Sequence, residues 1–461
     1  MPDPRFPTRA PAATAGLSRR SFLRGTAAAV AGTALAGSSA SLLAGCGGDA
    51  GGSSNQLTFW NFYGPADDHN PQSQWFVSMV EEWNKNNDVK VNLRYLPVAE
   101  YLAGTALQTA FQSGSGPDIF MISPGDFLRY FNGGVLQDLS PHLSAKAKAD
   151  YVPGVLDTRM VDGRIYGLPM EIEPLAMYYD VRAFESAGLS EGDVPRTWDQ
   201  LLDVADKLTN ADRFGVLFET IPGYYQNFTW YPFMWMGGST AVKNGRSSFN
   251  SPGTVEALRF WQDTVDTGVA PRKPQGDGAG DIGANLASGY CAMQQSGIWS
   301  VADLALSYKD FEYGVFRLPT PSGGTYTTDL GGWAFVANAQ GSNPEAAAQF
   351  VAWALGSTDP EGVERSRRWN TVVKTNLPTR RSVQAAAERH GAFSDGAMAT
   401  FAHQVAPQGR PEPRYTPEVY QAISDALQGC QLAGSDPAEA AAEASETIDG
   451  FLQSYRGAPI I

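Results

Sequence analysis

The stretch GRIYGLPMEIEPLAMYYD, residues 163–180, decides how the rest of the chain can be arranged. Its middle cannot be helical, because Pro169 and Pro174 each bias the preceding residue toward extended geometry. The residues on either side predict two short strands, the second of them mostly apolar and buried on both faces. Residues two apart on an extended chain point to the same side, so Glu171 and Glu173 share one side of the link between the strands.

These two glutamates allow two interpretations. Paired carboxylates beside tyrosines, on a chain that passes between two lobes, suit the floor of a site for a hydroxyl-rich ligand. An ordinary strand–turn–strand with glutamates at the surface accounts equally well for residues 163–180 taken alone. The choice between them depends on the rest of the chain.

The first 45 residues have the features of an export signal. A twin-arginine motif, SRRSFL at 18–23, precedes an uncharged run rich in Ala, Gly and Leu over 26–43. The run ends in LAGC, which resembles a bacterial lipobox and implies cleavage before Cys46 and a lipid on its thiol. One acyl chain binds a membrane only weakly, so stable anchoring needs two or more. Residues 46–56 then predict a lipidated cysteine and a flexible tether, at the outer face of the cytoplasmic membrane.

Composition excludes several classes of ligand. The chain carries 48 acidic and 34 basic residues, and its formal net charge of −14 argues against nucleic acid or an anionic membrane surface. Four isolated histidines and the lack of a CxxC or HExxH motif argue against a transition-metal site, and we expect no metal and no cofactor. Export permits a disulfide between Cys291 and Cys430, but the distance between them decides that.

The body of the chain opens with alternating strands and helices. Strands are predicted over 57–63, 91–95 and 119–122, with amphipathic helices between them, the second over 99–112. This order predicts an α/β fold with a parallel sheet and helices on both faces. Ligands of such sheets lie at the carboxyl ends of the strands. Those ends carry the candidate residues Trp60, Asn61, Tyr63, Ser123 and Asp126.

The second half adds helices and two aromatic segments. A capping box at 197–200 opens one helix, and others are predicted over 252–267, 343–355, 417–432 and 437–455. Residues 224–238 hold seven aromatic side chains, more than one helix face needs, so we expect one or two to face a cleft. Gly331 and Gly332 let a ligand approach the backbone closely, and Trp333 supplies a ring beside them.

These segments, in this order, resemble the family 1 extracellular solute-binding proteins, the lipid-anchored sugar receptors of ABC importers that include maltose- and trehalose-binding proteins. The resemblance spans nearly the whole chain after Cys46. The matching pieces are 57–63, 116–120, 163–180, 228–230, 235–238, 293–299, 313–320, 331–333 and 377–380.

The resemblance implies two α/β lobes joined by crossing hinge strands, with the ligand held in a cleft between them. Lobe one is expected to comprise 57–168 with 317–358, and lobe two 169–316 with 359–461. The receptor is expected to be a monomer that closes on a carbohydrate, a mono- or oligosaccharide, and is then recognised in its closed form by the membrane permease subunits of an importer.

The resemblance also implies roles for single residues. Glu173 occupies a position where relatives bind sugar hydroxyls, Trp299 and Trp333 match rings that stack on sugars, and Trp230 matches an aromatic at the cleft rim. Arg380 approximately matches a late basic position, and Asp126 is the candidate replacement for an aspartate that several relatives carry at Ser123. The full set of expected ligand contacts is Trp60, Asn61, Tyr63, Ser123, Asp126, Glu171, Glu173, Trp230, Trp235, Trp299, Gly332, Trp333 and Arg380.

Three other interpretations compete with that of a sugar receptor. Glu171 and Glu173 could be a glycosidase pair, but two carboxylates side by side on one strand are badly placed to flank a scissile bond, and we predict no enzyme. A receptor of the same fold for a polyamine also uses aromatic walls and carboxylates. The third alternative is an adhesin or structural lipoprotein with an empty cleft, and the aromatic cluster at 224–235 argues against it.

Overall fold

The computed structural model describes residues 55–65 and 69–461. The twin-arginine motif, Cys46 and most of the tether lie outside the described residues. Among the described helices, none is both long and apolar enough to cross a membrane.

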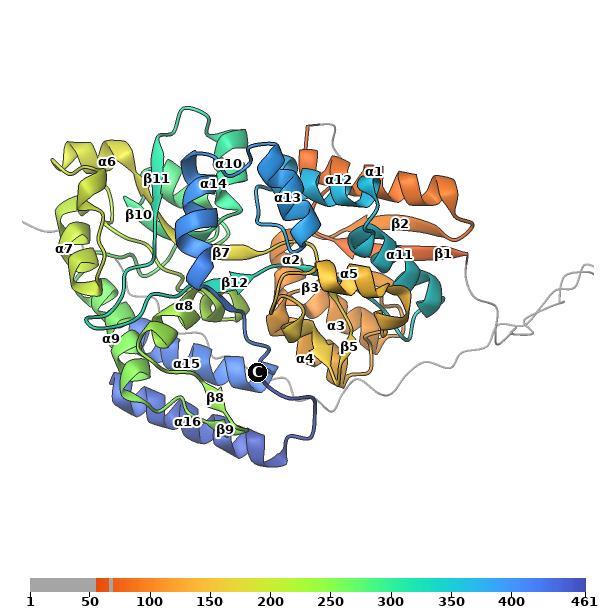
Figure 1. The fold of residues 1–461 in the computed structure, drawn as a ribbon. Coiled ribbons are helices and arrows are strands. Elements are labelled where there is room, and N and C mark those ends of the chain that lie inside the picture. Colours follow the sequence, from red (N-terminus) through yellow and green to blue (C-terminus); the bar gives the residue numbers. More distant parts are fainter. Residues whose placement is uncertain (1–54, 66–68) are drawn as a thin grey trace, which may run out of the picture. The chain divides into compact units, whose positions relative to one another are not determined.

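The first sheet has five strands in the order β2-β1-β3-β13-β6, and Figure 1 labels β1, β2 and β3 of them. These are β1 (Gln56–Asn61), β2 (Lys90–Tyr95), β3 (Ile119–Ile122), β13 (Ala334–Ala337) and β6 (Leu168–Pro169). Strand β1 pairs in parallel with β2 and β3, as expected, whereas β13 is antiparallel to both β3 and β6. The parallel sheet expected from the first three strands is confirmed, and β13, which begins opposite Ile122 where β3 ends, adds an antiparallel strand to it.

Helices pack on this sheet through apolar stripes. The helices are α1 (Pro71–Asn86), α2 (Val98–Ala103), α3 (Thr105–Gln112), α4 (Pro124–Asn132), α5 (Ala145–Asp150) and α11 (Pro344–Gly356). In α1, Trp75, Phe76, Met79, Val80 and Trp83 are buried at helical spacing. The helix expected over 99–112 is two helices, because Gly104 between them has a left-handed backbone with φ of 71°.

The second sheet is built around β7 (Glu173–Asp180), which is antiparallel to its three partners β10 (Met293–Gly297), β11 (Tyr313–Phe316) and β12 (Asp329–Gly331). Strand β14 (Arg410–Pro411) pairs with β12. Residues 173–179 of β7 are all buried, as predicted for its central part. Two hairpins stand apart, β4 (Met160–Val161) with β5 (Arg164–Ile165), and β8 (Val242–Lys243) with β9 (Arg246–Ser247).

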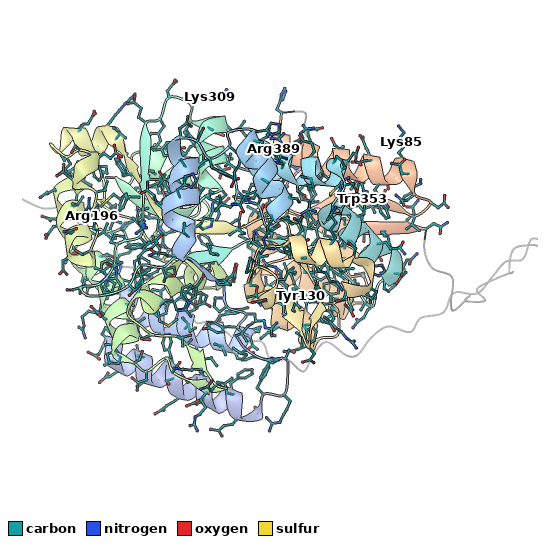
Figure 2. All side chains as sticks on the ribbon, in the orientation of Figure 1. Lys85, Tyr130, Arg196, Lys309, Trp353 and Arg389 are labelled. Atoms are coloured by element: carbon teal, nitrogen blue, oxygen red, sulfur yellow. The ribbon has the colours of Figure 1, made fainter. Side chains whose placement is uncertain are left out.

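The remaining helices surround the second sheet and the links between the sheets (Figure 1). They are α6 (Val181–Ser186), α7 (Trp198–Leu208), α8 (Tyr224–Met236), α9 (Pro252–Asp266), α10 (Ser300–Ser307), α12 (Pro360–Arg368), α13 (Arg381–Arg389), α14 (Gly396–Thr400), α15 (Pro417–Ala433) and α16 (Pro437–Ser454). The charged side chains labelled in Figure 2, such as Lys85 on α1 and Lys309 after α10, project from the periphery. Cys291 and Cys430 are buried and free, so they form no disulfide.

The lobe boundaries expected from the sequence differ from the packing at two places. Leu318 and Tyr326, expected in lobe one, belong to the core of the second sheet, because β12 pairs with β7 and keeps the chain there until Gly331. The π-helical turn Trp369–Val373, expected in lobe two, packs in the first core, where the Trp369 ring lies 4.7 Å from that of Trp75. The chain therefore crosses between the sheets at 170–173, 331–333 and 374–377.

Gly332 is the tightest point of these crossings. Its φ is 132°, and a Cβ added there would lie 2.3 Å from the Glu171 carbonyl oxygen. Gly332→Ala should lower the free energy of unfolding by more than the roughly 1–3 kcal/mol that backbone strain alone costs. Gly323→Ala is the matched control, because Gly323 also has a positive φ, 74°, but open space around the added carbon. Urea unfolding of both variants checks this, and equal losses would contradict a steric limit at Gly332.

Candidate functional site

Backbone hydrogen bonds tie the three crossing segments together. Leu377 and Ile172 exchange a pair of bonds at 2.8 and 3.2 Å, and the Met170 amide donates to the Trp333 carbonyl at 2.9 Å. Gly331 stands opposite Glu173 in the β12–β7 ladder. Side chains from positions far apart in the sequence therefore meet here.

Glu171 is fully buried at the first crossing. The indole N–H of Trp369 donates a hydrogen bond to its Oε2 atom. Burial raises the pKa of the Glu171 carboxyl, and the Lys374 ammonium and the Trp369 bond oppose that rise.

Glu173, two residues on, is held in a similar way. Asn376 donates from Nδ2 to the Glu173 Oε1 atom at 3.0 Å. Burial, reinforced by the neighbouring Glu171, raises the pKa of Glu173 to about 8, although Lys374 and Asn376 act in the opposite direction.

A third buried carboxyl, Glu412, follows β14. Its Oε1 atom accepts a hydrogen bond of 3.0 Å from the Gly125 amide in the first turn of α4. Burial raises the pKa of Glu412 to about 8, while the Tyr224 hydroxyl and the Arg159 guanidinium lower it. The Arg159 guanidinium in turn donates to the Gly332 carbonyl, so Arg159 links this carboxyl to the second crossing.

Aromatic rings line the carboxyls on both sides. The centres of the Tyr63 and Trp369 rings lie 4.9 Å apart. The Lys374 ammonium lies 5.4 Å from the centre of the Tyr63 ring. The Trp333 ring meets Phe62 at 4.8 Å. From the second sheet, Tyr225, Phe228 and Trp299 form a group in which Trp299 lies 6.3 Å from each of the other two rings. The Phe228 ring abuts Gly331, where an added Cβ would lie 2.6 Å from it.

Several expected residues meet at this place. Tyr63, Glu171, Glu173, Gly332 and Trp333 are brought together, and both tryptophans expected to stack, Trp299 and Trp333, remain partly exposed. Asn61 is buried beside them, with its Oδ1 atom accepting from the Tyr63 amide at 2.9 Å. Ser123 stands at the N-cap position of α4, next to the Tyr224 hydroxyl, and Asp126 on the same helix is paired with Arg129 at 3.3 Å.

Other expected residues have structural places instead. Trp230 was expected at a cleft rim, but it is fully buried in the second core, where its ring packs on Phe249. Arg380 was expected as a ligand contact, but its guanidinium is buried and donates to the carbonyls of Ser357 and Gly362 and to the Ser366 hydroxyl.

Two further tryptophans are covered by arginines. The guanidinium of Arg94 lies 4.2 Å above the Trp60 ring, and that of Arg410 lies 4.6 Å above the Trp235 ring. Both indoles are nearly buried, and none of the described contacts joins the Trp60 ring to the crossing segments.

Sequence reasoning missed Lys374, Asn376, Glu412 and Phe228. One signal could have found Glu412, because Glu173 and Glu412 both precede a proline, which holds the glutamate in an extended backbone. Nothing in the local pattern at 374–376 marks it as part of a site. Among the described residues, no group of three or more His, Cys, Asp or Glu side chains could hold a metal ion.

The model of the bacterial extracellular solute-binding protein family matches residues 66–359. The chain belongs to this family. Membership of this extracellular family, whose proteins bind solutes and are not enzymes, implies that the solute-binding protein is exported.

Individual proteins that this chain resembles also bind solutes, as their names state. This solute-binding protein is 26% identical over 328 residues to an arabinooligosaccharide-binding protein of Bacillus subtilis (strain 168), covering 66% of this chain and 70% of the relative. It is 27% identical over 302 residues to the maltodextrin-binding protein MdxE of the same strain, covering 62% and 67%. A cyclic alpha-maltosyl-1,6-maltose binding protein from Arthrobacter globiformis has the same fold, with a TM-score of 0.69 at 22% identity over 87% of this chain and 99% of that one. The expected two-lobed α/β fold is confirmed.

The raised carboxyl pKa values make stability depend on pH. Because the folded protein holds the Glu173 proton more tightly than the unfolded chain, whose carboxyl titrates near 4.5, stability should fall as pH rises from there to about 8. Glu412 acts in the same direction. Each extra proton bound by the folded state corresponds to about 1.4 kcal/mol per pH unit.

Glu173→Gln should therefore flatten the decline in the free energy of unfolding, measured by urea unfolding across this range. Glu312→Gln is the control, because Glu312 is exposed and ion-paired with Arg182 at 3.2 Å. A wild-type stability that rises over the same range would contradict the buried, proton-holding carboxyls.

Proposed function

We propose that this protein captures a saccharide at its three crossing segments and delivers it to the membrane permease subunits of an ABC importer. The observation that carries the proposal is the meeting of Glu171, Glu173, Asn376 and Glu412 beside aromatic rings from both sheets. Carboxylates and amides accept hydrogen bonds from ring hydroxyls, and charge-assisted bonds are the stronger kind. The apolar C–H faces of a pyranose pack on indole and phenyl rings.

Saccharides are favoured over polyamines by the relatives. The names of the two Bacillus subtilis relatives state oligosaccharide ligands, and the matched region spans about two thirds of the length of each relative. The site also contains Lys374 and Arg159, which a linear polycation would have to approach. The closed form binds the ligand better than the open form does, so the ligand shifts the population toward the shape that the permease recognises.

The protein is proposed to be a monomer without enzymatic activity. Glu171 and Glu173 project from one extended segment and are held by Trp369 and Asn376, an arrangement that orients a ligand and does not flank a scissile bond.

A thermal-shift screen of mono- and oligosaccharides, with polyamines included, identifies the ligand. A ligand at 100 times its dissociation constant stabilises the fold by about 2.7 kcal/mol, a detectable shift. Stabilisation by a polyamine and by no saccharide would overturn the proposal.

With that saccharide, Trp299→Ala and Trp333→Ala should lose affinity with little loss of stability, because both rings are partly exposed. Trp230→Ala should instead cost about 3–5 kcal/mol of stability, as expected for a fully buried ring. Calorimetric titration and melting of the three variants separate the roles. Intact affinity with a large drop in melting temperature, for either Trp299→Ala or Trp333→Ala, would remove that residue from the site.

We also propose that the twin-arginine leader 1–45 directs export and that lipid on Cys46 anchors the protein to the outer face of the cytoplasmic membrane. The motif LAGC at 43–46 supports this. Cys46→Ser should block processing or release the protein from membranes, as judged by fractionation of cells and the size of the product. Normal cleavage with unchanged membrane retention would contradict the anchor.

A further inference from the structure

The hydrogen-bonding atoms left over at the crossing segments are mostly acceptors. Glu171 Oε1, Asn376 Oδ1 and Glu412 Oε2 are buried and complete no hydrogen bond of good geometry with any described residue, although the Tyr63 hydroxyl lies beside Glu171 and the Tyr224 hydroxyl beside Glu412. Asn376 donates one of its two amide N–H bonds to Glu173. Buried acceptors without a partner are costly, so a ligand that brings donors to this place gains more than one that brings acceptors.

The charges at the same place are unbalanced. Every ion pair found within 55–65 and 69–461 uses other carboxyls, so Glu171, Glu173 and Glu412 have no basic nitrogen within 4.0 Å. Lys374 lies close enough to attract the first two, and Arg159 to attract the third. Burial keeps protons on Glu173 and Glu412 near neutral pH, and a ligand cation placed among these carboxyls would favour their ionised forms and add charge-assisted hydrogen bonds.

An aromatic ring lies beside one of these carboxyls, Glu412. A Cβ added at Gly331 would lie 2.6 Å from the Phe228 ring and 3.3 Å from Glu412 Oε2, so the ring and the carboxyl lie against the same point of the backbone. The face of an aromatic ring attracts a cation. Ring, carboxyls and free acceptors thus favour the same kind of group.

We propose that the saccharide bound here carries a protonated amino group, which lies among Glu171, Glu173 and Glu412. This inference rests on the proposed saccharide-binding function. An ammonium has three N–H donors and no acceptor, whereas a hydroxyl also brings an acceptor to a place that already has too many.

The remaining donors distinguish an amino sugar from a simple polyamine. Asn61 Nδ2 and Arg159 Nε are buried and have no partner among the described residues. They suit the hydroxyl oxygens of a sugar ring. The methylene chain of a polyamine would leave both donors without an acceptor.

Matched saccharides test the proposal by calorimetry near neutral pH. Each set shares ring configuration and linkage and differs only at C2 of each ring, which bears an amino, a hydroxyl or an acetamido group. The β-1,4-linked glucosamine dimer, cellobiose and diacetylchitobiose are one set, and glucosamine, glucose and N-acetylglucosamine another, with the corresponding galactose series. The amino member of the best-binding set should bind about tenfold more tightly, or better, than its neutral counterparts.

Two variants locate the effect. Glu412→Gln keeps an acceptor for the Gly125 amide but cannot ionise beside a ligand cation, and should reduce the amino preference severalfold. Glu312→Gln removes the same charge from an exposed site and should leave it unchanged.

The outcomes are distinguishable. If the neutral members bind as tightly as the amino members or more tightly, this inference is overturned and the saccharide function stands. An amino preference that is equal in wild type and Glu412→Gln also overturns it, because the amine would then lie elsewhere. Binding of spermidine or putrescine and of no saccharide, or no binding at all, overturns the proposed function and this inference with it.

Discussion

Three extended backbone segments that hydrogen-bond to one another between two sheets are the constraint on which the structure depends. The bonds between Ile172 and Leu377, and between Met170 and Trp333, fix the crossings side by side. Gly332 makes this possible, because a side chain there would collide with the Glu171 carbonyl. Each sheet can then build its own core, while the crossings and the segment after β14 carry polar side chains into the interior between them.

Those polar side chains make the junction electrostatically expensive. A buried carboxyl costs free energy unless it is paired, hydrogen-bonded or protonated. Trp369, Asn376 and the Gly125 amide each satisfy one oxygen of a different glutamate, and Lys374 and Arg159 supply partial compensation. The pKa of both Glu173 and Glu412 remains raised to about 8. A ligand with suitable donors would stabilise these buried carboxyls. Ligand binding can in this way favour one arrangement of the lobes.

The aromatic helix α8 shows why position within a fold matters more than composition. All of residues 226–236 are buried, on every face of the helix. Phe228 points to the crossing at Gly331, whereas Trp230, two residues on, packs on Phe249 in the core. A helix that is apolar all round has no hydrophobic stripe, so its sequence does not reveal which face meets the site.

Local sequence pattern by itself predicted the strands β1, β2, β3 and β7 and the helices α1, α15 and α16. It also placed Glu171 and Glu173 on one side of an extended link. These features follow from side-chain period and proline geometry over a few residues. The order of the segments that resemble the family was enough to predict the two-lobed fold. Only the tertiary structure decided that Lys374, Asn376 and Glu412 lie beside these two glutamates. The same holds for the hydrogen bonds of Arg380 to backbone carbonyls and for the chain crossings between the sheets at 331–333 and 374–377. The reason is distance along the chain: about 200 or more residues separate these partners from Glu173, and contacts at that separation are set by how two sheets pack, which no local period encodes.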